Sequence, residues 1–527
     1  MHYDDSLMDF YQVLTPRDMR ATEEKAFALG VPGTLLMEHA AMAVTDALEK
    51  ELGCCKGKKV LFLCGTGNNG GDGLAAARLF AMRGGNPEIW LSGMPKTPDA
   101  QMNYAWCKHL GIKILNLREM TPEEMPLRGD GPRDVFDGYV DALLGTGLQG
   151  KPDALTTVMI NVPWHDFSGR PVIAVDIPSG IHGLTGEVYD GVYVHADVTV
   201  TFHAPKPGLY LTKDREAVGR IVVADIGLWN MAPWYSDALL LEENELNCEV
   251  MTEKALRLLP KRALNAHKGD MGRILIYAGS MGLCGAAAMC ARAAIAAGAG
   301  LTTLACPREC MPVLQRLVPG AMCMDIEKVL TDKPAFDVLV MGCGLGQGEE
   351  VWQQIMRLYD PEKPSVWDAD ALNLLAKAPF LLGEHAVITP HIGEAARLLG
   401  CSVADVMADK LLAARKLCEK YGCTVVLKSD VTVICQISDG KAEYLLNTAG
   451  SPAMAKGGSG DVLAGMLGAL LHRERDALQA AGLGCLWHGL AGEAGEKRFG
   501  IHELTAEQLI DCFYEARREN QQWNTGV

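Results

Sequence analysis

One glycine-rich turn followed by an aspartate carries the strongest chemical signal in the sequence. The segment 447–465 reads NTAGSPAMAKGGSGDVLAG. The glycines of Gly457–Gly460 let the backbone approach an anion, and the apolar run after Asp461 predicts a buried helix whose first amides point at that anion. Because a helix dipole stabilises negative charge at this end, we expect Asp461 to stay ionised and to accept a proton from a substrate hydroxyl. The alternative for such a residue is a simple helix cap.

Polar residues also follow three predicted strands in the first half of the chain. The apolar run 59–64 precedes GTGNNGGDG, a second run ends in Asp141 before LLGTGLQGK, and VIAV at 172–175 precedes Asp176 and Ser179. In a parallel sheet all three loops open at one edge, where ligands bind. Asparagine, aspartate and serine oxygens converging there suit a hard monovalent or divalent cation. Each residue alone is explained as a turn residue or cap, but the three together favour a site.

The first of these loops satisfies GxGxxG at positions 65–70, which is typical of dinucleotide-binding dehydrogenases. Such an enzyme needs an acidic residue near the end of its second strand, whereas Glu88 stands at the beginning of EIWLS. Asn68, Asn69 and Asp72 also fill the loop with polar side chains that a plain pyrophosphate turn does not need. The loop therefore predicts a ligand or cation site rather than a dehydrogenase.

These loops belong to two series of alternating strands and helices, which predict α/β folds with doubly wound parallel sheets. The 527 residues exceed what one hydrophobic core usually serves, so we expect two domains. The pattern loosens after Trp229, and we place the boundary between 232 and 233, which gives domains 1–232 and 233–527. Strands of the second half are expected at 274–277, 301–305, 338–341, 365–367, 386–389 and 424–428.

Composition narrows the class of protein. Hydrophobic residues make up 49% and charged residues 22%, which is ordinary for a soluble α/β enzyme, and the net charge of −16 argues against nucleic-acid binding. The seventeen cysteines are scattered and lack zinc spacing, so we expect reduced thiols. The acidic start of the chain is no secretory signal, and the Ala-rich segment 282–300 favours a packed helix over a membrane span. A cytoplasmic enzyme is the expectation.

In the first half, GNNGGDG, VDALLGTGL and VDIPSG resemble the motifs of the NAD(P)H-hydrate epimerase family, over about residues 11–228. The resemblance implies a Rossmann-like three-layer sandwich, a potassium ion held by Asn69, Asp141 and Ser179, and acid/base chemistry by Asp176 at the hydrated C6 carbon. It also implies a hydrate pocket lined by Asn68, Asn69, Gly70, Gly71, Asp72, Gly145, Thr146, Gly147, Leu148, Gln149, Gly150, Lys151 and Asp176. The sequence EHAA at 38–41 departs from the family pattern and concerns contacts of the entry helix.

In the second half, HKGDMG, GCGLGQ, DADAL, TPHIGEAARLL, LKSDVT and GSPAMAKGGSGDVLAG follow in the order typical of the NAD(P)H-hydrate dehydratases of the ribokinase-like superfamily. The resemblance implies that Ala286, Gly346, His391 and Asp461 bind the hydrate. It assigns ADP to Lys428, Ser429, Asp430, Val431, Thr432, Ser451, Pro452, Ala453, Met454, Ala455, Lys456, Gly457, Gly458, Ser459 and Gly460. Ser451 and Lys456 replace the commoner Asn and Thr or Ser, and Lys456 either strengthens anion binding or is a solvated side chain. For His391 taken alone, a structural histidine with satisfied hydrogen bonds is the favoured interpretation.

Together the two resemblances imply a bifunctional repair enzyme. The first half interconverts R and S NADHX and NADPHX, and the second dehydrates the S form to NAD(P)H with ADP as co-substrate, giving AMP and phosphate. Potassium and Mg²⁺ are the implied ions, and a homo-oligomer is expected. Two alternatives stay open: a ribokinase-like vitamin kinase that releases its phosphorylated product, and a first half that only senses nucleotides. The sequence does not decide between NADHX and NADPHX.

Overall fold

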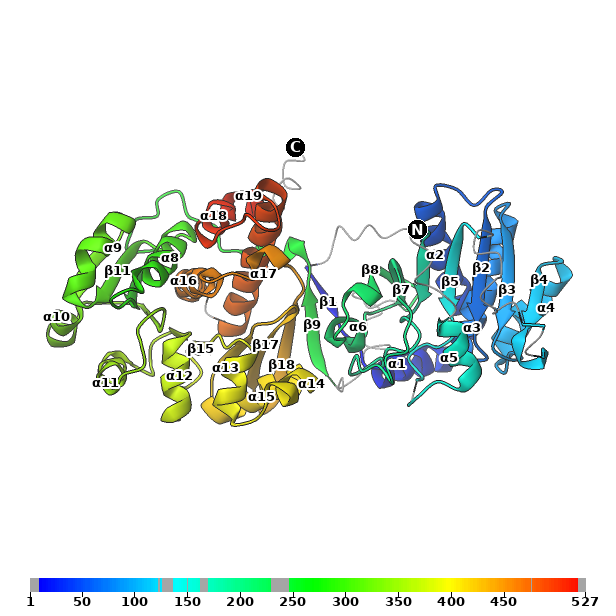
Figure 1. Ribbon diagram of the computed structural model, residues 1–527, viewed down its shortest axis with the longest axis horizontal. Coiled ribbons are helices and arrows are strands. Elements are labelled where there is room, and N and C mark those ends of the chain that lie inside the picture. Colours follow the sequence, from blue (N-terminus) through cyan, green and yellow to red (C-terminus); the bar gives the residue numbers. More distant parts are fainter. Residues whose placement is uncertain are drawn as a thin grey trace. The chain divides into compact units, whose positions relative to one another are not determined.

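The computed structural model describes residues 9–121, 124–125, 136–148, 150–161, 169–228, 246–474 and 476–519. The chain forms two compact units (Figure 1): an N-terminal unit, Gln12–Leu246, and a C-terminal unit that joins Met1–Tyr11 to Asn247–Val527. Each unit has its own sheet and hydrophobic core. The boundary expected between 232 and 233 lies outside the described residues. Within the described ranges we find no helix with the length and apolar character of a membrane span.

The N-terminal unit is built on a seven-stranded sheet in which every neighbouring pair is parallel. Its strand order is β4-β3-β2-β5-β6-β7-β8. The strands are β2 (Lys59–Cys64), β3 (Asn86–Leu91), β4 (Lys113–Asn116), β5 (Gly138–Ala142), β6 (Val172–Val175), β7 (Val198–Phe202) and β8 (Arg220–Ala224). The order reverses between β2 and β5, and ligands of such sheets bind outside the carboxyl ends at that point.

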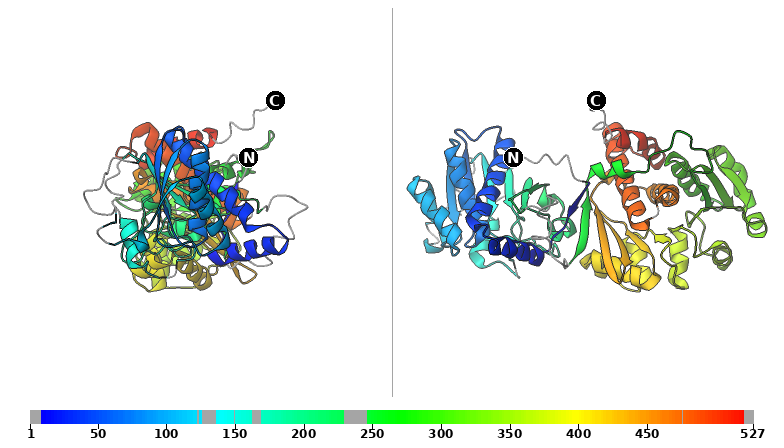
Figure 2. Two further views of the ribbon diagram at one scale, coloured as in Figure 1. Left: turned by 90° about the vertical axis from the view of Figure 1, so that its right-hand side faces the viewer. Right: turned by 180° about the vertical axis from the view of Figure 1, so that it is seen from behind.

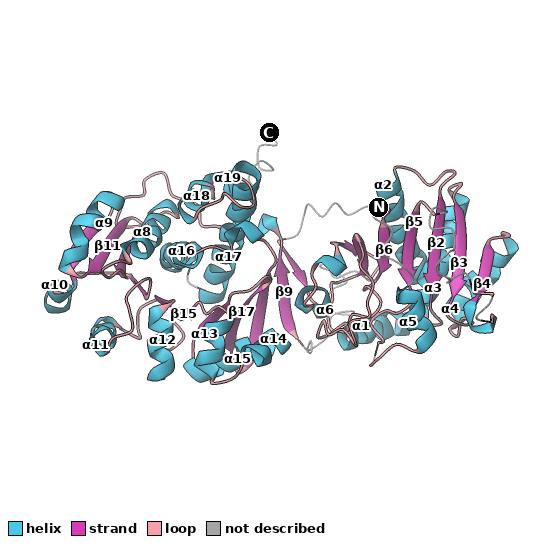
Figure 3. Ribbon diagram, in the orientation of Figure 1, coloured by secondary structure: helices cyan, strands magenta, loops and turns pink. Residues whose placement is uncertain are grey.

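Helices cover both faces of this sheet, as the strand pattern requires (Figure 3). Successive side chains of a strand point to opposite faces. Val60 and Phe62 accordingly join one core cluster with α2 and α3, whereas Leu61 and Leu63 join another with α5. The helices are α1 (Pro16–Ala28), α2 (Gly33–Leu52), α3 (Asn68–Met82), α4 (Pro98–His109), α5 (Ala154–Asn161) and α6 (Pro207–Leu211). These three layers confirm the fold class expected for the first half.

The C-terminal unit contains an eleven-stranded sheet with the order β1-β9-β18-β17-β16-β15-β14-β13-β10-β11-β12. The run from β16 through β10 to β12 is parallel, and β17 is antiparallel to both of its neighbours. The strands are β1 (Phe10–Gln12), β9 (Asn247–Met251), β10 (Arg273–Tyr277), β11 (Leu301–Cys306), β12 (Met322–Asp325), β13 (Val338–Met341), β14 (Ser365–Trp367), β15 (Ala386–Ile388), β16 (Thr424–Leu427), β17 (Thr432–Ser438) and β18 (Lys441–Asn447). The six strands expected here all exist.

Two groups of helices cover this sheet (Figures 1 and 2). The red and orange helices lie on one side and the yellow ones on the other. The first group is centred on α8 (Cys284–Ala296), α16 (Ser459–Arg473) and α17 (Ala477–Phe499), followed by α18 (Ala506–Asp511) and α19 (Phe513–Glu519). The remaining helices are α9 (Met311–Leu317), α10 (Ile326–Thr331), α11 (Glu349–Leu358), α12 (Asp370–Lys377), α13 (Ile392–Leu399), α14 (Val403–Ala408) and α15 (Lys410–Tyr421). The apolar run after Asp461 is the buried helix that the sequence predicts.

The edge strand β1 was not predicted from the sequence, because it lies more than 230 residues before the rest of its sheet. It pairs with β9, and Phe10 packs against the core of the C-terminal unit. Asp9 accepts a hydrogen bond from the Thr252 amide at 2.9 Å and pairs with Arg257 at 2.6 Å. The start of the chain therefore completes the C-terminal unit.

Deletion of residues 1–11 should destabilise the C-terminal unit alone, by on the order of 1–3 kcal/mol, because it removes a strand and exposes an edge. Scanning calorimetry of the full and shortened chains measures this, and one transition should move while the other stays. Asp9→Asn is the milder control, since it removes the ion pair and keeps the strand. Equal displacement of both transitions would contradict the assignment of β1 to one unit.

Candidate active sites at the two sheet edges

The glycine loop after β2 turns directly into a helix. A Cβ on Gly70 would lie 2.0 Å from the Gly65 carbonyl oxygen, so only glycine permits this close return of the chain. As a result α3 begins at Asn68, within the glycine-rich loop itself. Asn68, Asn69 and Asp72 thus lie in the first turns of a helix over the end of β2, not in an extended loop.

Two of the three predicted potassium ligands are bonded to each other beneath this helix. Ser179 donates to Asp141 through its amide at 2.7 Å and its hydroxyl at 2.6 Å. Both residues are fully buried, and burial raises the pKa of Asp141 to about 6 although the Ser179 bonds oppose the shift. Asn69 is the third, and a Cβ on Gly145 in the loop after β5 would lie 3.1 Å from its side chain. Asn69 therefore lies beside the loop that Ser179 contacts at Leu144, at the switch between β2 and β5.

Asp176 directly follows the carboxyl end of β6, and its side chain accepts hydrogen bonds at one oxygen. Its Oδ1 accepts a hydrogen bond from Lys206 Nζ at 2.6 Å and one from Thr201 Oγ1 at 3.1 Å. The side chain of Asp176 is 13% exposed, against 1% for Lys206. Asp176 also has a left-handed backbone, with φ 66°, which is uncommon for a residue with a side chain and is often found at functional sites.

Two more carboxyl groups lie in the electrostatic field of Asp176. Burial raises the pKa of Glu23 on α1, and the charge of Asp176 adds to that shift while Lys206 opposes it. Burial also raises the pKa of Asp72 on α3, again with a contribution from Asp176. A site with one paired carboxylate and two carboxyl groups that hold their protons more tightly can both accept and donate a proton.

The loop expected to line the same pocket follows β5. Thr146 approaches Gly183, whose Cβ would lie 3.4 Å from the Thr146 methyl group. Lys151 is exposed and pairs with Asp190 at 2.5 Å. Gln149 lies outside the described residues. Lys151 is thus directed to another loop and has no contact with Asp176 among the interactions of the described chain.

The turn before α16 in the C-terminal unit depends on Gly458. This residue caps the helix with φ 100°, and a Cβ there would lie 2.5 Å from Met289 Sδ. Only glycine combines this backbone with that contact. The helix begins at Ser459, so Asp461 is its third residue, and the amides of its first turn are the free ones that an anion uses.

Asp461 lies in a cluster with Cys343 after β13 and Asp368 after β14, whose ligand atoms are all within 4.8 Å of one another. Burial raises the pKa of Asp461 to about 6, and the charge of Asp368 adds to the shift. The expectation that the helix dipole favours its ionised form was therefore incomplete, because burial outweighs the dipole. Asp461 remains largely ionised at neutral pH but accepts a proton far more readily than a solvated aspartate, as a general base should.

Lys428, which directly follows β16, contacts this cluster. Lys428 Nζ donates to Asp368 Oδ1 at 2.8 Å, and Thr389 Oγ1 donates to the same oxygen at 2.8 Å. A Cβ on Gly460 would lie 3.4 Å from Lys428 Nζ, so the ammonium lies against the phosphate-binding turn. Burial alone would lower the pKa of Lys428, but Asp368 and Glu394 raise it, so it stays charged.

Besides Asp461, the residues expected to bind the hydrate come from the first turn of α8, the loop after β13 and the cap of α13. His391 caps α13, and its Nδ1 accepts hydrogen bonds from the amides of Gly393 and Glu394. Burial and Lys428 lower the pKa of His391, so the ring is neutral and its proton is on Nε2. The structural and functional interpretations of His391 are therefore compatible. Ala286 meets Gly344 across the β10–β13 switch, and the Gly346 amide donates to Asp370 at 2.8 Å.

Several polar residues expected to contact ADP are engaged within the protein. Lys456 is exposed and its Nζ donates to the His502 carbonyl. Ser451 donates to Glu496 and accepts from the Ala453 amide at 3.0 Å, which makes it a cap. Buried Lys410 donates to Asp430 at 2.7 Å. The cation that the structure puts at the glycine turn is thus Lys428, and Lys456 is bonded elsewhere.

Comparison with known proteins identifies the family of the chain. Residues 33–208 match a family model described as YjeF-related protein N-terminus, and residues 274–514 match one described as NAD(P)H-hydrate dehydratase. A bifunctional NAD(P)H-hydrate repair enzyme of Moorella thermoacetica is 35% identical, over 91% of this chain and 92% of its own. That of Escherichia coli K12 is 38% identical, over 85% and 83%. The chain belongs to the family of bifunctional NAD(P)H-hydrate repair enzymes.

Among solved structures, an ADP/ATP-dependent NAD(P)H-hydrate dehydratase of Bacillus subtilis, co-crystallised with ATP and Mg²⁺, is 28% identical. It covers 51% of this chain and 98% of its own, with a TM-score of 0.47.

Three residues of the present chain that were not predicted from its sequence lie in the two sites: Lys206, Asp368 and Cys343. Asp368 stands in the quoted DADAL motif, and Lys206 follows β7 in HAPKPG; a lysine just after a buried strand was the available signal.

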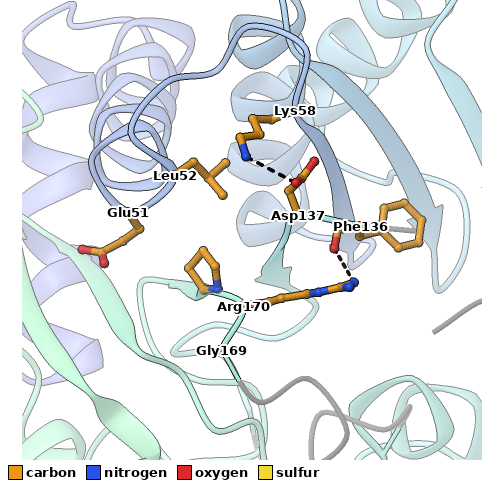
Figure 4. A pocket seen from close by; sticks show the side chains of 8 residues that line it. Glu51, Leu52, Lys58, Phe136, Asp137, Gly169 and Arg170 are labelled. Carbon is orange, nitrogen blue, oxygen red and sulfur yellow. Dashed lines mark hydrogen bonds and ion pairs between the residues drawn. The ribbon is translucent and has the colours of Figure 1, made fainter. Parts of the chain in front are cut away.

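A separate cavity of about 390 Å³ lies at the opposite edge of the N-terminal sheet (Figure 4). Lys58, Asp137 and Pro171 line it, and each immediately precedes a strand. Lys58 pairs with Asp137 at 3.4 Å, and Arg170 Nη1 donates to the Phe136 carbonyl at 2.5 Å. Because ligands of parallel sheets bind at the carboxyl ends, this cavity at the amino ends is not the catalytic site.

The pKa of Asp461 predicts the pH dependence of the second site. Because the base must be ionised, kcat/KM for the reaction of the C-terminal unit should fall as the pH drops through about 6. Asp368→Asn should move this acid limb to lower pH, since the charge of Asp368 raises the pKa of Asp461. Asp461→Asn should lose about two to four orders of magnitude in rate. Initial rates across the pH range measure all three.

The stability of the same variant supplies the control. The pKa of Asp461 in the folded chain is about 6, above its ordinary value of 3.8. Ionisation of Asp461 therefore lowers the free energy of unfolding as the pH rises from 3.8 to about 6. Asp461→Asn should then unfold at the same temperature as the wild type or a higher one near pH 8. A variant with near wild-type rate would show that Asp461 is only a helix cap.

Proposed function

We propose that this chain repairs hydrated nicotinamide nucleotides in two steps. The N-terminal unit interconverts R and S NADHX or NADPHX, and the C-terminal unit dehydrates the S form with ADP, giving AMP and phosphate. The observation that carries the proposal is the position of Asp461, a partly buried carboxylate behind a glycine turn with the Lys428 ammonium beside that turn. Spontaneous hydration gives both epimers, so a stereospecific dehydratase recovers all of the nucleotide only with an epimerase.

In the dehydratase step, Asp461 takes the proton of the C6 hydroxyl, and the oxygen attacks the terminal phosphorus of ADP. The bond from that phosphorus to AMP breaks, and the hydrate becomes a C6 phosphate ester. Phosphate then leaves C6 while a proton leaves C5, which restores the ring double bond. Lys428 and the amides of the first turn of α16 stabilise the charge on the transferred phosphoryl group.

In the epimerase step, the C6–O bond breaks with the help of the ring nitrogen lone pair, and it forms again from the other face. The leaving oxygen needs a proton and the entering water must lose one, so the reaction requires acid and base groups but no net change of charge. Asp176 is the proposed group for this proton movement. Glu23 and Asp72, whose pKa values are raised by burial, are neighbouring sources of a proton.

Potassium fits the residues proposed for it. Asn69 Nδ2 is buried and has no hydrogen-bond partner among the described residues, so this donor is left for an acceptor such as a substrate oxygen, while the amide oxygen of Asn69 is the atom that would bind the ion. Asn69, Asp141 and Ser179 supply oxygen atoms from three separate elements, the donor set of a hard cation. When bound, the ion would stabilise negative charge on substrate oxygens and tie the three loops together. Mg²⁺ would accompany the phosphates of ADP, as in other phosphoryl transfers.

The main alternative from another enzyme class is a ribokinase-like vitamin kinase. It would use the same glycine turn and base but release its phosphorylated product intact. A second alternative makes the N-terminal unit a nucleotide sensor without turnover; the paired carboxylate Asp176 in a site with two further carboxyl groups favours proton chemistry instead. A homo-oligomer and a cytoplasmic location remain predictions.

Single-site variants of the full chain should separate the two activities. Asp461→Asn should stop formation of NAD(P)H but leave exchange of the two hydrate epimers, whereas Asp176→Ala should do the reverse. Absorbance recovery from purified S hydrate with ADP measures dehydration, and chromatography of the two hydrates measures exchange. With Asp176→Ala, R hydrate should disappear only at its spontaneous epimerisation rate. Equal consumption of both epimers by that variant would exclude the division of labour, and a stable phosphorylated product would favour the kinase.

Potassium should support epimerisation better than lithium, because three protein oxygens from separate elements form a roomy site. Asp141→Ala should weaken this dependence, and the binding of a potassium surrogate such as Tl⁺ should fall with it. Dehydration by the same preparation is the internal control for a folded chain. If epimerase activity is the same after exhaustive replacement of potassium, the ion has no role in that reaction.

A further inference from the structure

We propose that Lys206 and Thr201 are positioning residues of the first site, which hold one oxygen of Asp176 and leave the other for the hydrate. This inference rests on the proposed epimerase function and explains how its acid/base residue is oriented. Neither residue belongs to the set of pocket and ion contacts expected from the sequence.

Lys206 cannot reach a substrate, because all three protons of its ammonium are used. It donates to Asp176 Oδ1 at 2.6 Å, to Thr201 Oγ1 at 3.1 Å and to the Phe202 carbonyl at 3.0 Å. The side chain is 1% exposed. A buried ammonium is costly unless it is paired with opposite charge, and Asp176 supplies that charge. The role left for Lys206 is to act through Asp176.

The two bonds to Asp176 converge on the same oxygen. Thr201 and Lys206 both donate to Oδ1, and within the part of the chain that the structure describes no donor reaches Oδ2. A carboxylate anchored at one oxygen no longer rotates freely, so its second oxygen has a fixed place. The backbone is fixed as well, since the Asp176 amide donates to the Val200 carbonyl at 2.8 Å. This geometry is that of a pre-organised base.

Other ionisable groups surround this anchor. Burial raises the pKa values of Glu23 on α1 and Asp72 on α3, and the charge of Asp176 adds to both shifts. His203, just after β7, has its pKa lowered to about 4, first by burial and then by Lys206, so it stays neutral and cannot replace the ammonium. Lys206 is therefore the cation that contacts Asp176 in this acidic surrounding.

Strand β7 offers a matched pair of variants for the test. Thr199 and Thr201 are both fully buried on this strand, but the Thr199 hydroxyl donates to the Val218 carbonyl at 2.7 Å. Thr201→Val should lower kcat for epimerisation about tenfold with KM nearly unchanged, roughly the effect of one lost hydrogen bond. Thr201→Ser should restore most of it. Thr199→Val should lower stability to a similar degree and leave kcat unchanged.

Lys206→Met should have the larger effect, about a hundredfold in kcat, and its acid limb in the pH–rate profile should move to higher pH, because an unpaired carboxylate takes up a proton more easily. The double variant with Asp176→Asn should be no slower than Asp176→Asn alone, since Lys206 acts through Asp176. Dehydration by the same chain and calorimetry report folding; if Lys206→Met does not fold, the Thr201 pair decides.

The two proposals fail in different ways. If the wild type does not exchange the epimers, the epimerase function is wrong. If the wild type exchanges them and Thr201→Val behaves like Thr199→Val, with an unmoved pH profile in Lys206→Met, the positioning role is overturned.

Discussion

In both units a lysine pairs with an aspartate at the carboxyl edge of a parallel sheet, and the sites are arranged around these pairs. Lys206 binds Asp176, and Lys428 binds Asp368. The Lys206 side chain is 1% exposed and that of Lys428 is 21% exposed, so the aspartate offsets a larger desolvation cost for Lys206. Because the carboxyl ends of parallel strands lie at the same edge of a sheet, residues far apart in the sequence meet there without any long loop. The pairs set the charge that the remaining groups experience.

The two pairs act on different targets. In the N-terminal unit the lysine holds the proposed acid/base residue itself, so the carboxylate of Asp176 is stabilised directly. In the C-terminal unit the lysine holds Asp368, and Asp461 lies beside that pair without a lysine of its own; burial and Asp368 then raise its pKa to about 6. One site fixes a carboxylate in place, and the other makes a carboxylate more basic.

The sequence predicts the fold well where the signal is local. Short buried strands such as 59–64 and 338–341 end where the apolar runs end, and the helix after Asp461 follows from its apolar residues. The edge strand at Phe10–Gln12 could not be predicted, because its partner lies more than 230 residues away and three residues carry too little pattern. The roles of Lys206 and Asp368 could not be predicted for a similar reason, because they depend on which strands become neighbours in the sheet. The hydrogen bond from Lys456 to the His502 carbonyl joins residues far apart in the sequence, so no local pattern predicts it.

The difference between the two carboxylates matches the difference between the two reactions. Epimerisation joins states of similar energy, so its catalyst must release each proton as easily as it accepts it, and the Lys206 contact holds the proposed carboxylate in one orientation. Dehydration is driven by the transfer of a phosphoryl group, and its base must take a proton from a weakly acidic hydroxyl, which a raised pKa favours. The ionised form of Asp461 lowers folding stability for the same reason that it is a good base, because burial opposes its charge. A chain that needs both behaviours gains from two separate sheet edges, since no single electrostatic environment provides them together.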